Sequence, residues 1–198
     1  MEIPGIDRRN LLTQLFPSPD EHLFISGLAG PARDAAALTA DGDNLFTMAG
    51  TMGAAVSMGL GVALSAPHCN IAVITGDGEL LMNVGALATV ATQGPANLSI
   101  VCIDNGCHGE TGGQLGHTSH RCNLAKMAEG AGFSSVMSIA SPHEIAEAAD
   151  FLKAANSPRF LLVHVSNGPP SDYKRNLDPA ACRLRFQNAY LKDLKKSP

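Results

Sequence analysis

The sequence predicts one α/β domain, a three-layer fold in which a parallel sheet carries helices on both faces. Residues 70–75 and 97–103 are short, mostly apolar runs without a polar face, as expected for strands covered on both sides. Segments with helical spacing of apolar residues alternate with such runs, which favours a parallel sheet. The 198 residues suffice for one sizeable core. We therefore expect a single domain over residues 1–198, with an arm and a terminal helix from about residue 167.

The first third of the chain predicts a strand, a glycine-rich turn and two helices. Apolar spacing indicates a helix at residues 8–16, ended by Pro17. A strand at 22–26 leads into the turn GLAGPAR and a helix with Pro31 in its first turn, an order that offers backbone N–H groups to an anion. Residues 46–66 pass from a loop into a helix of small residues. Gly53, Gly59 and Gly61 are expected to let this segment approach another backbone or a ligand closely.

The rest of the chain continues the alternation. The strand at 70–75 is followed by a helix whose apolar rhythm runs from Leu80 to Ala91, and then by the strand at 97–103. Residues 104–121 form a long polar loop with five glycines, and such loops are typically functional or disordered. The remaining elements are expected as a helix at 123–131, a strand at 133–138, a helix at 143–155 and a strand at 159–165.

Composition and charge exclude several classes of protein. The formal charge is −4 and no basic stripe precedes the last residues, so we expect no nucleic-acid partner. No apolar run reaches the length of about 18 residues that would suggest a membrane helix. The five cysteines are odd in number and scattered, without a C-x-x-C pair, which argues against disulfides, a zinc site or an iron–sulfur cluster within this chain. A cytoplasmic protein is the simplest expectation.

Two oxygen-bearing side chains follow neighbouring predicted strands. Asp77 comes directly after the strand at 70–75, and Asn105 comes after the strand at 97–103. Ligands collect at the carboxyl ends of parallel strands, and carboxylate and amide oxygens suit Mg²⁺. The alternative is a tight hairpin turn at Asp77-Gly78. The residues after Gly78 have helical rather than alternating spacing, so the hairpin lacks a second strand.

The motif Gly76-Asp77-Gly78, followed by twenty-six residues and then Asn105, resembles the thiamine diphosphate-binding motif. The stretches LLMNVGALATVA and DNGCHGETGGQ look most like sulfopyruvate and phosphonopyruvate decarboxylases, particularly the separate β-type subunit of the former. The similarity extends from about His22 to the terminal arm. It implies the cofactors thiamine diphosphate and Mg²⁺ and the fold of the diphosphate-binding domain.

The resemblance also assigns roles at the metal and the diphosphate. Asp77 and Asn105 would bind Mg²⁺, with the backbone carbonyl of Cys107 as the third protein ligand. The diphosphate would lie beside Gly76, Gly78 and the Glu79 N–H group. Further contacts would come from the turn that contains Ser26, Gly27 and Gly30.

The stretch 50–53 would hold the pyrimidine side of the cofactor. The Gly50 carbonyl would accept a hydrogen bond from the aminopyrimidine, and Met52 would support the bent cofactor between its rings, with Thr51 in the same stretch. For Met52 the alternative is ordinary packing.

Two features depart from the family pattern. A serine or alanine is common at the position of Glu79, and a carboxylate beside a diphosphate is repulsive unless it turns away. The turn SGLAG lacks the usual threonine hydroxyls. Both changes are expected to affect the strength of cofactor binding.

The family's chemistry needs a glutamate that activates the pyrimidine ring, and that residue belongs to a second domain. One domain uses this whole chain, so the resemblance implies a separate pyrimidine-binding subunit and a hetero-oligomer. The substrate would be an anionic, 3-substituted 2-oxoacid. Alternatives are the cofactor-binding half of a carboligase or of a 2-oxoacid:ferredoxin oxidoreductase, or a cofactor-binding homologue without activity.

The loop 104–121 supplies candidates for contact with substrate. His108 and Gln114 fall in the pattern DNG-x-H-x-x-TGGQ and are our candidate catalytic residues. His117 and His120 are better explained as solvated loop residues. Arg33 would suit an anionic substrate tail, although an ordinary surface position explains it equally well.

Overall fold

A parallel sheet forms the centre of the molecule. The computed structural model describes residues 5–154 and 156–194, and within them six strands pair in the order β2-β1-β3-β4-β8-β7. The bounds are β1 His22–Ser26, β2 Leu45–Thr47, β3 Asn70–Gly76, β4 Leu98–Asp104, β7 Ser135–Ile139 and β8 Arg159–His164. Every neighbouring pair is parallel, and all residues of β4 are buried. The strands read from the sequence as covered on both faces therefore occupy the middle of the sheet.

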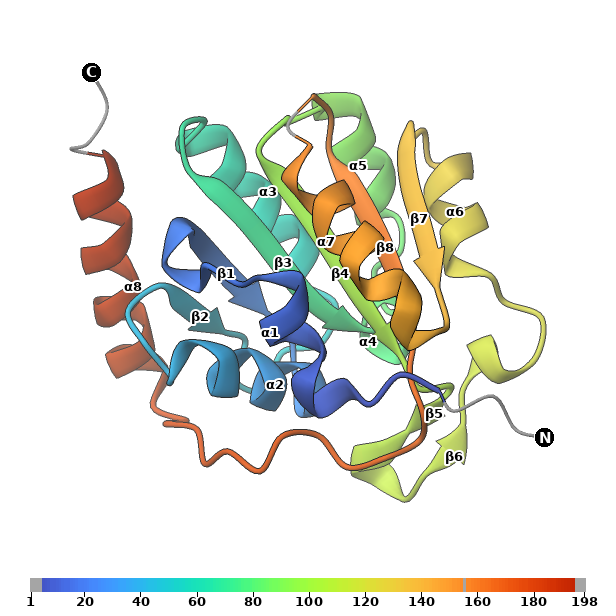
Figure 1. The fold of residues 1–198 in the computed structure, drawn as a ribbon. Helices are drawn as coiled ribbons and strands as arrows, with labels where there is room; N and C mark the ends of the chain where they lie inside the picture. Colours follow the sequence, from blue (N-terminus) through green and yellow to red (C-terminus); the bar gives the residue numbers. More distant parts are fainter. Residues whose placement is uncertain (1–4, 155, 195–198) are drawn as a thin grey trace.

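Helices cover both faces of this sheet (Figure 1). One buried cluster joins the sheet to α1 (Leu11–Leu15), α2 (Ala29–Thr39) and α7 (Ile145–Lys153). The opposite cluster joins it to α3 (Ala55–Ser65), α5 (Ala86–Gln93) and α6 (Leu124–Gly130). Short 3₁₀ turns lie at Arg8–Asn10, Pro19–Glu21, Gly109–Thr111, His117–Ser119 and Pro142–Glu144. The predicted three-layer α/β class is confirmed.

Four local expectations differ from the structure. The segment 46–66 was expected to begin as a loop, but its start belongs to β2, which pairs with β1. The helix expected from Leu80 to Ala91 is broken into α4 (Asp77–Leu81) and α5 by a turn at residues 82–85. The loop 104–121 contains a small antiparallel pair, β5 (Cys107–His108) and β6 (Gln114–Leu115). The helix expected at 143–155 is found as a 3₁₀ turn followed by α7, and residue 155 lies outside the described residues.

The chain after β8 runs along the carboxyl edge of the sheet before it reaches α8 (Pro179–Leu194) (Figure 1). Helix α8 covers the edge strand β2, where the Thr47 N–H group donates to the Cys182 sulfur at 3.5 Å. The arm is tied to α2 because the Ser171 N–H group donates to Asp34 Oδ1 at 2.8 Å. The arm therefore lies beside the strand ends at which ligands were expected.

Close approach explains two of the three glycines noted in residues 46–66. A Cβ atom on Gly59 would overlap Val73, so glycine lets α3 lie directly on β3. Gly53 has φ +84, and a Cβ there would come within 3.2 Å of the Met82 and Asn83 Cβ atoms. Gly61 has open space around it, so the expectation of a close approach was wrong at that position.

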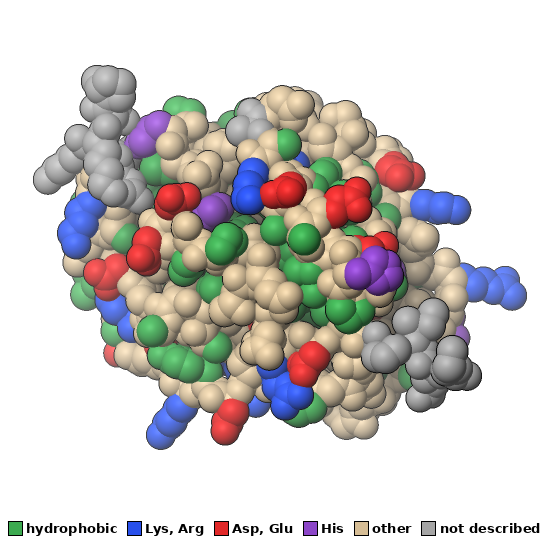
Figure 2. Space-filling model, viewed as in Figure 1, with side chains coloured by type: hydrophobic (Ala, Val, Ile, Leu, Met, Phe, Trp, Pro, Cys, Tyr) green, Lys and Arg blue, Asp and Glu red, His purple; other side chains and the backbone are tan. Residues whose placement is uncertain are grey.

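On the face shown in Figure 2, acidic and basic side chains are interspersed. Among the described residues, no helix is both long and apolar enough to cross a membrane.

Candidate functional site

A cavity of about 750 Å³ opens at the carboxyl ends of the strands. Its walls come from the segment after β1, the segment after β3 and the loop after β4, with residues 167–170 of the arm along one side. Strand β1 lies between β2 and β3, so the chain leaves β1 toward one side of the sheet and β3 continues toward the other. Such a reversal of strand order opens a crevice in which α/β proteins bind ligands.

The structure brings most of the predicted site residues to this cavity. Its wall contains Gly30, Met52, Gly76, Asp77, Gly78, Glu79, Asn105, Cys107 and His108. The other predicted residues, which do not line it, are Ser26, Gly27, Gly50, Thr51 and Gln114. Residues from three strand ends and one distant loop therefore converge. The spacing of the motif predicted this for Asp77 and Asn105.

Asp77 is a buried carboxylate with another carboxylate close by. It begins α4 and is 4% exposed. Thr118 Oγ1 lies 3.2 Å from Asp77 Oδ2 and 2.7 Å from Asp104 Oδ1, so one hydroxyl bridges the two acids. Burial, and then the charge of Asp104, raise the pKa of Asp77 above its usual value. A bound cation would remove this penalty, which makes Asp77 a fitting metal ligand.

Asp104 is the more stable anion of the two. Burial alone would raise its pKa, but hydrogen bonds from His164, Thr118 and the Gly106 N–H group lower the pKa below its usual value. Sequence reasoning did not name Asp104 or Thr118 as site residues. The position of Asp104 directly before Asn105 was the available signal, whereas Thr118 reaches the site only through the folded loop.

The remaining metal-ligand candidates lie in the loop after β4. Asn105 is partly buried, and its Oδ1 accepts a hydrogen bond from the Cys107 N–H group at 3.3 Å. The Cys107 thiol donates to Asn167 Oδ1 at 3.2 Å, and burial raises the pKa of this thiol. The described residues contain no cluster of three His, Cys, Asp or Glu side chains suited to a metal. Asp77, Asn105 and the backbone of this loop offer carboxylate, amide and carbonyl oxygen, the donor types that Mg²⁺ prefers.

The Glu79 carboxylate points into the loop that connects β1 to α2. Its Oε2 accepts a hydrogen bond from the Leu28 N–H group at 3.0 Å. A Cβ atom on Gly27 would fall on this carboxylate, which explains why residue 27 is glycine. The group is 4% exposed, and Oε1 has no hydrogen-bond partner among the described residues. Burial raises the pKa of Glu79 above its usual value.

Glu79 and its neighbours change how the turn can serve a ligand. The Leu28 N–H group is one of the donors expected to face an anion, yet it is engaged by Glu79. Ala29, which lines the cavity, adopts a left-handed backbone with φ 61. The Ser26 hydroxyl is fully buried and has no hydrogen-bond partner within the described chain.

The stretch 50–53 reaches the cavity through Met52. Gly53 rests on the turn between α4 and α5, and the Asn83 side chain donates to the Gly53 carbonyl at 3.0 Å. Met52 is 41% exposed at the cavity wall, and Gly50 and Thr51 are exposed beside it. Met52 is therefore not packed in the core, which was the alternative explanation for this residue.

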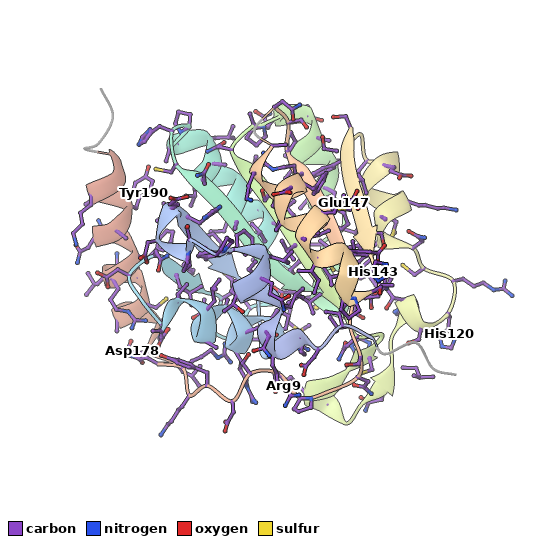
Figure 3. All side chains as sticks on the ribbon, viewed as in Figure 1. Arg9, His120, His143, Glu147, Asp178 and Tyr190 are labelled. Carbon is purple, nitrogen blue, oxygen red and sulfur yellow. The ribbon has the colours of Figure 1, made fainter. Side chains whose placement is uncertain are left out.

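The histidines of the loop separate into two groups. His108 lines the cavity, and a Cβ atom on Gly78 would come within 2.9 Å of its ring, so the ring lies against the start of α4. Gln114 is exposed and exchanges hydrogen bonds with Thr111 at 2.8 and 2.9 Å. His117 and His120 are also exposed, and His120 lies on the outer edge of the loop (Figure 3).

Two arginines line the cavity. Arg33, on α2, is exposed and lies 4.0 Å from Glu110 across the opening. Arg8 is buried and forms an ion pair with Asp34. Sequence reasoning placed Arg8 only at a helix start, because its partner lies 26 residues further along the chain.

The chain is a parallel α/β domain with a buried Asp77, the Asn105 amide at the next strand end and a cavity at the strand-order reversal, where proteins of this class bind ligands. The profile of the family described as "Thiamine pyrophosphate enzyme, C-terminal TPP binding domain" matches residues 33–165. The chain belongs to this family, as the resemblance implied.

Relatives agree with this assignment, and a solved structure shares the fold. The β subunit of sulfopyruvate decarboxylase from Methanocaldococcus jannaschii is 31% identical over 172 residues, which are 86% of this chain and 89% of the relative. Phosphonopyruvate decarboxylase from Streptomyces viridochromogenes is 39% identical over 131 residues, 66% of this chain and 32% of that protein. A crystal structure described as a thiamin diphosphate-dependent enzyme from Mycobacterium smegmatis superposes with a TM-score of 0.69 at 20% identity, covering 84% of this chain and 34% of that one.

Proposed function

We propose that this chain is the thiamine diphosphate- and Mg²⁺-binding subunit of a heteromeric 2-oxoacid decarboxylase. The observation that carries the proposal is the buried Asp77 carboxylate, whose pKa is raised beside Asp104 in a cavity that Asn105 and Cys107 also line. An acidic site of this kind calls for a cation, and the cation in turn recruits a diphosphate.

The residues of the site divide the work of holding the cofactor. Asp77 and Asn105 would bind Mg²⁺ together with the Cys107 carbonyl, and Gly76, Gly78, the Glu79 N–H group and the start of α2 at Gly30 would face the diphosphate. Gly50, Thr51 and Met52 would support the pyrimidine end. Thiamine diphosphate supplies the electron sink for loss of CO₂, while the protein provides orientation and electrostatics.

The proposed second subunit would complete the site with a glutamate that activates the pyrimidine ring. The similarity to a protein named as a β subunit, matched over most of both chains, supports a heteromeric enzyme. Met52 and Met82 are 41% and 64% exposed at the cavity wall, where an opposing subunit would cover them. The five free thiols suit a cytoplasmic enzyme.

For the substrate we propose a pyruvate with an anionic group on carbon 3, of the sulfopyruvate or phosphonopyruvate type. The names of the relatives support this class. Arg33 lies exposed at the cavity wall and would meet the anionic group, while His108 against Gly78 would contact the reacting end or move a proton there. Gln114 would reach the substrate only after its hydrogen bonds with Thr111 are exchanged.

The test is a decarboxylation assay of the purified chain mixed with the product of a neighbouring gene of similar length. Sulfopyruvate, phosphonopyruvate and pyruvate are compared, with Mg²⁺ and thiamine diphosphate present. We expect CO₂ and an aldehyde from an anionic substrate, and a higher KM for that substrate in Arg33→Met. Acyloin or a reduced acceptor as product would favour a carboligase or an oxidoreductase, and absence of CO₂ from every 3-substituted pyruvate would refute the decarboxylase.

A further inference from the structure

Arg8 is a buried cation in the cavity wall with unused hydrogen-bond donors. Its side chain is 6% exposed. Nε donates to Asp34 Oδ2 at 2.8 Å, and Nη2 lies 2.7 Å from the same oxygen without making a hydrogen bond to any described residue. A guanidinium carries five N–H groups, and the two on Nη2 make no hydrogen bond to a described residue. Such a group in a cavity wall is suited to bind an anion.

The Arg8 guanidinium lies against the first turn of α2. A Cβ atom on Gly30 would come within 2.5 Å of Nη2 and 2.7 Å of Nη1, so glycine is required at position 30 for the two to pack. Helix α2 has 11 residues, and its first N–H groups and its dipole favour negative charge at this end. Both Arg8 and Gly30 line the cavity, so two positive features face the same space.

Asp34 fixes the guanidinium before any ligand arrives. It is 2% exposed, and its second oxygen accepts the Ser171 N–H group of the arm at 2.8 Å. The carboxylate is therefore held from two sides while it holds Arg8. A donor group fixed in this way loses little freedom when it binds, which favours affinity.

The position of Arg8 indicates which anion it would meet. Arg8 lines the same cavity as Asn105 and Cys107, which belong to the loop proposed to hold Mg²⁺. Arg33, in contrast, is 45% exposed and faces Glu110. Since Asp77 brings negative charge to the same cavity, a second cation beside the metal would favour a bound diphosphate.

We propose that Arg8 is a cofactor-binding residue that donates hydrogen bonds to a phosphoryl group of thiamine diphosphate, with Asp34 as its positioning residue. The inference rests on the proposed function, because it takes the cavity to hold that cofactor. Arginine suits this role since its planar fork matches phosphate oxygens.

Calorimetric titrations test the proposal with Mg²⁺-thiamine diphosphate, Mg²⁺-pyrophosphate and sulfoacetate as separate ligands. Loss of a charge-assisted hydrogen bond should weaken binding of the first two by about 10- to 100-fold in Arg8→Met, and less in Arg8→Lys, which keeps the charge. The matched control is Arg9→Met, because Arg9 is exposed on the same turn (Figure 3) and should leave both affinities within about twofold.

A second measurement needs no variant. In the wild-type protein, the Arg8 Nε–H resonance, assigned through its backbone amide, should shift when Mg²⁺-pyrophosphate is added. An unmoved resonance, or unchanged pyrophosphate affinity in folded Arg8→Met, overturns the inference. Loss of sulfoacetate binding alone also overturns it, since Arg8 would then serve the substrate. If the wild-type chain binds no thiamine diphosphate, the proposed function fails as well, whereas equal binding by wild type and Arg8→Met defeats only the role of Arg8.

Discussion

Replacing Gly27 by alanine tests how the Glu79 carboxylate is held. The new Cβ would occupy the place of the carboxylate, so Glu79 must turn into the cavity and release the Leu28 N–H group. A buried donor left without its acceptor costs about 1–3 kcal/mol, which is the expected loss in unfolding free energy for Gly27→Ala. This movement of the Glu79 side chain puts negative charge where the diphosphate would bind, so thiamine diphosphate affinity should also fall.

The decisive comparison is the same substitution in a Glu79→Ala background. There the space is empty and the Leu28 N–H group is already unpaired. The backbone of Gly27 does not have a positive φ, so alanine fits it without strain. Gly27→Ala should then be neutral or stabilise by about 0.4–1 kcal/mol through the unfolded chain.

The assay is urea unfolding followed by far-ultraviolet circular dichroism, because the chain has no tryptophan. A double-mutant cycle over the four proteins gives the coupling between the two positions, expected to be about 1–3 kcal/mol. Equal destabilisation by Gly27→Ala in both backgrounds would refute the contact between Glu79 and Gly27.

Three further predictions use the same assay. Burial raises the pKa of Glu79 above 4.5, so ionisation of this carboxyl costs stability. Relative to Glu79→Gln, the wild type should lose unfolding free energy as pH rises above about 4.5. A difference in unfolding free energy between the two proteins that stays constant from about pH 4 to 8 would contradict this. Gly59→Ala should lower the unfolding free energy by about 1–3 kcal/mol because the new Cβ overlaps Val73. The control Gly61→Ala, which has open space around the new Cβ, should raise it by about 0.5–1 kcal/mol. Similar effects of the two substitutions would refute the packing argument. Ala29→Gly should stabilise by up to about 1 kcal/mol by relieving φ 61, and a loss of stability would show that the turn is unstrained.

The layered fold was predictable because its strands are buried on both faces and its helices have apolar stripes. These signals are local, and they located all central strands. Strand β2 was missed since three residues are too few to show a period, and its place depends on pairing with β1 and on α8. The break between α4 and α5 was missed because it depends on contact with Gly53, some 30 residues earlier in the chain.

The metal-ligand candidates were predictable for a related reason. Asp77 and Asn105 directly follow parallel neighbours, so register alone brings them to one edge of the sheet. Residues that reach the cavity by tertiary contact left no such signal. Arg8 depends on Asp34, and Thr118 depends on the path of the loop between β4 and α6. The orientation of the Glu79 carboxylate could not be predicted either, because the residue type indicates a charge but not the direction in which the side chain points.

Calorimetric titration of thiamine diphosphate against the wild-type chain and Asp77→Ala, alone and with the partner subunit, tests the central claim most directly. Binding by the wild type should require Mg²⁺ and disappear with a chelator, because the cation links the carboxylate to the diphosphate. Asp77→Ala should remain folded and bind no cofactor. Equal binding by Asp77→Ala, or binding by the wild type without a divalent cation, would contradict the proposed site.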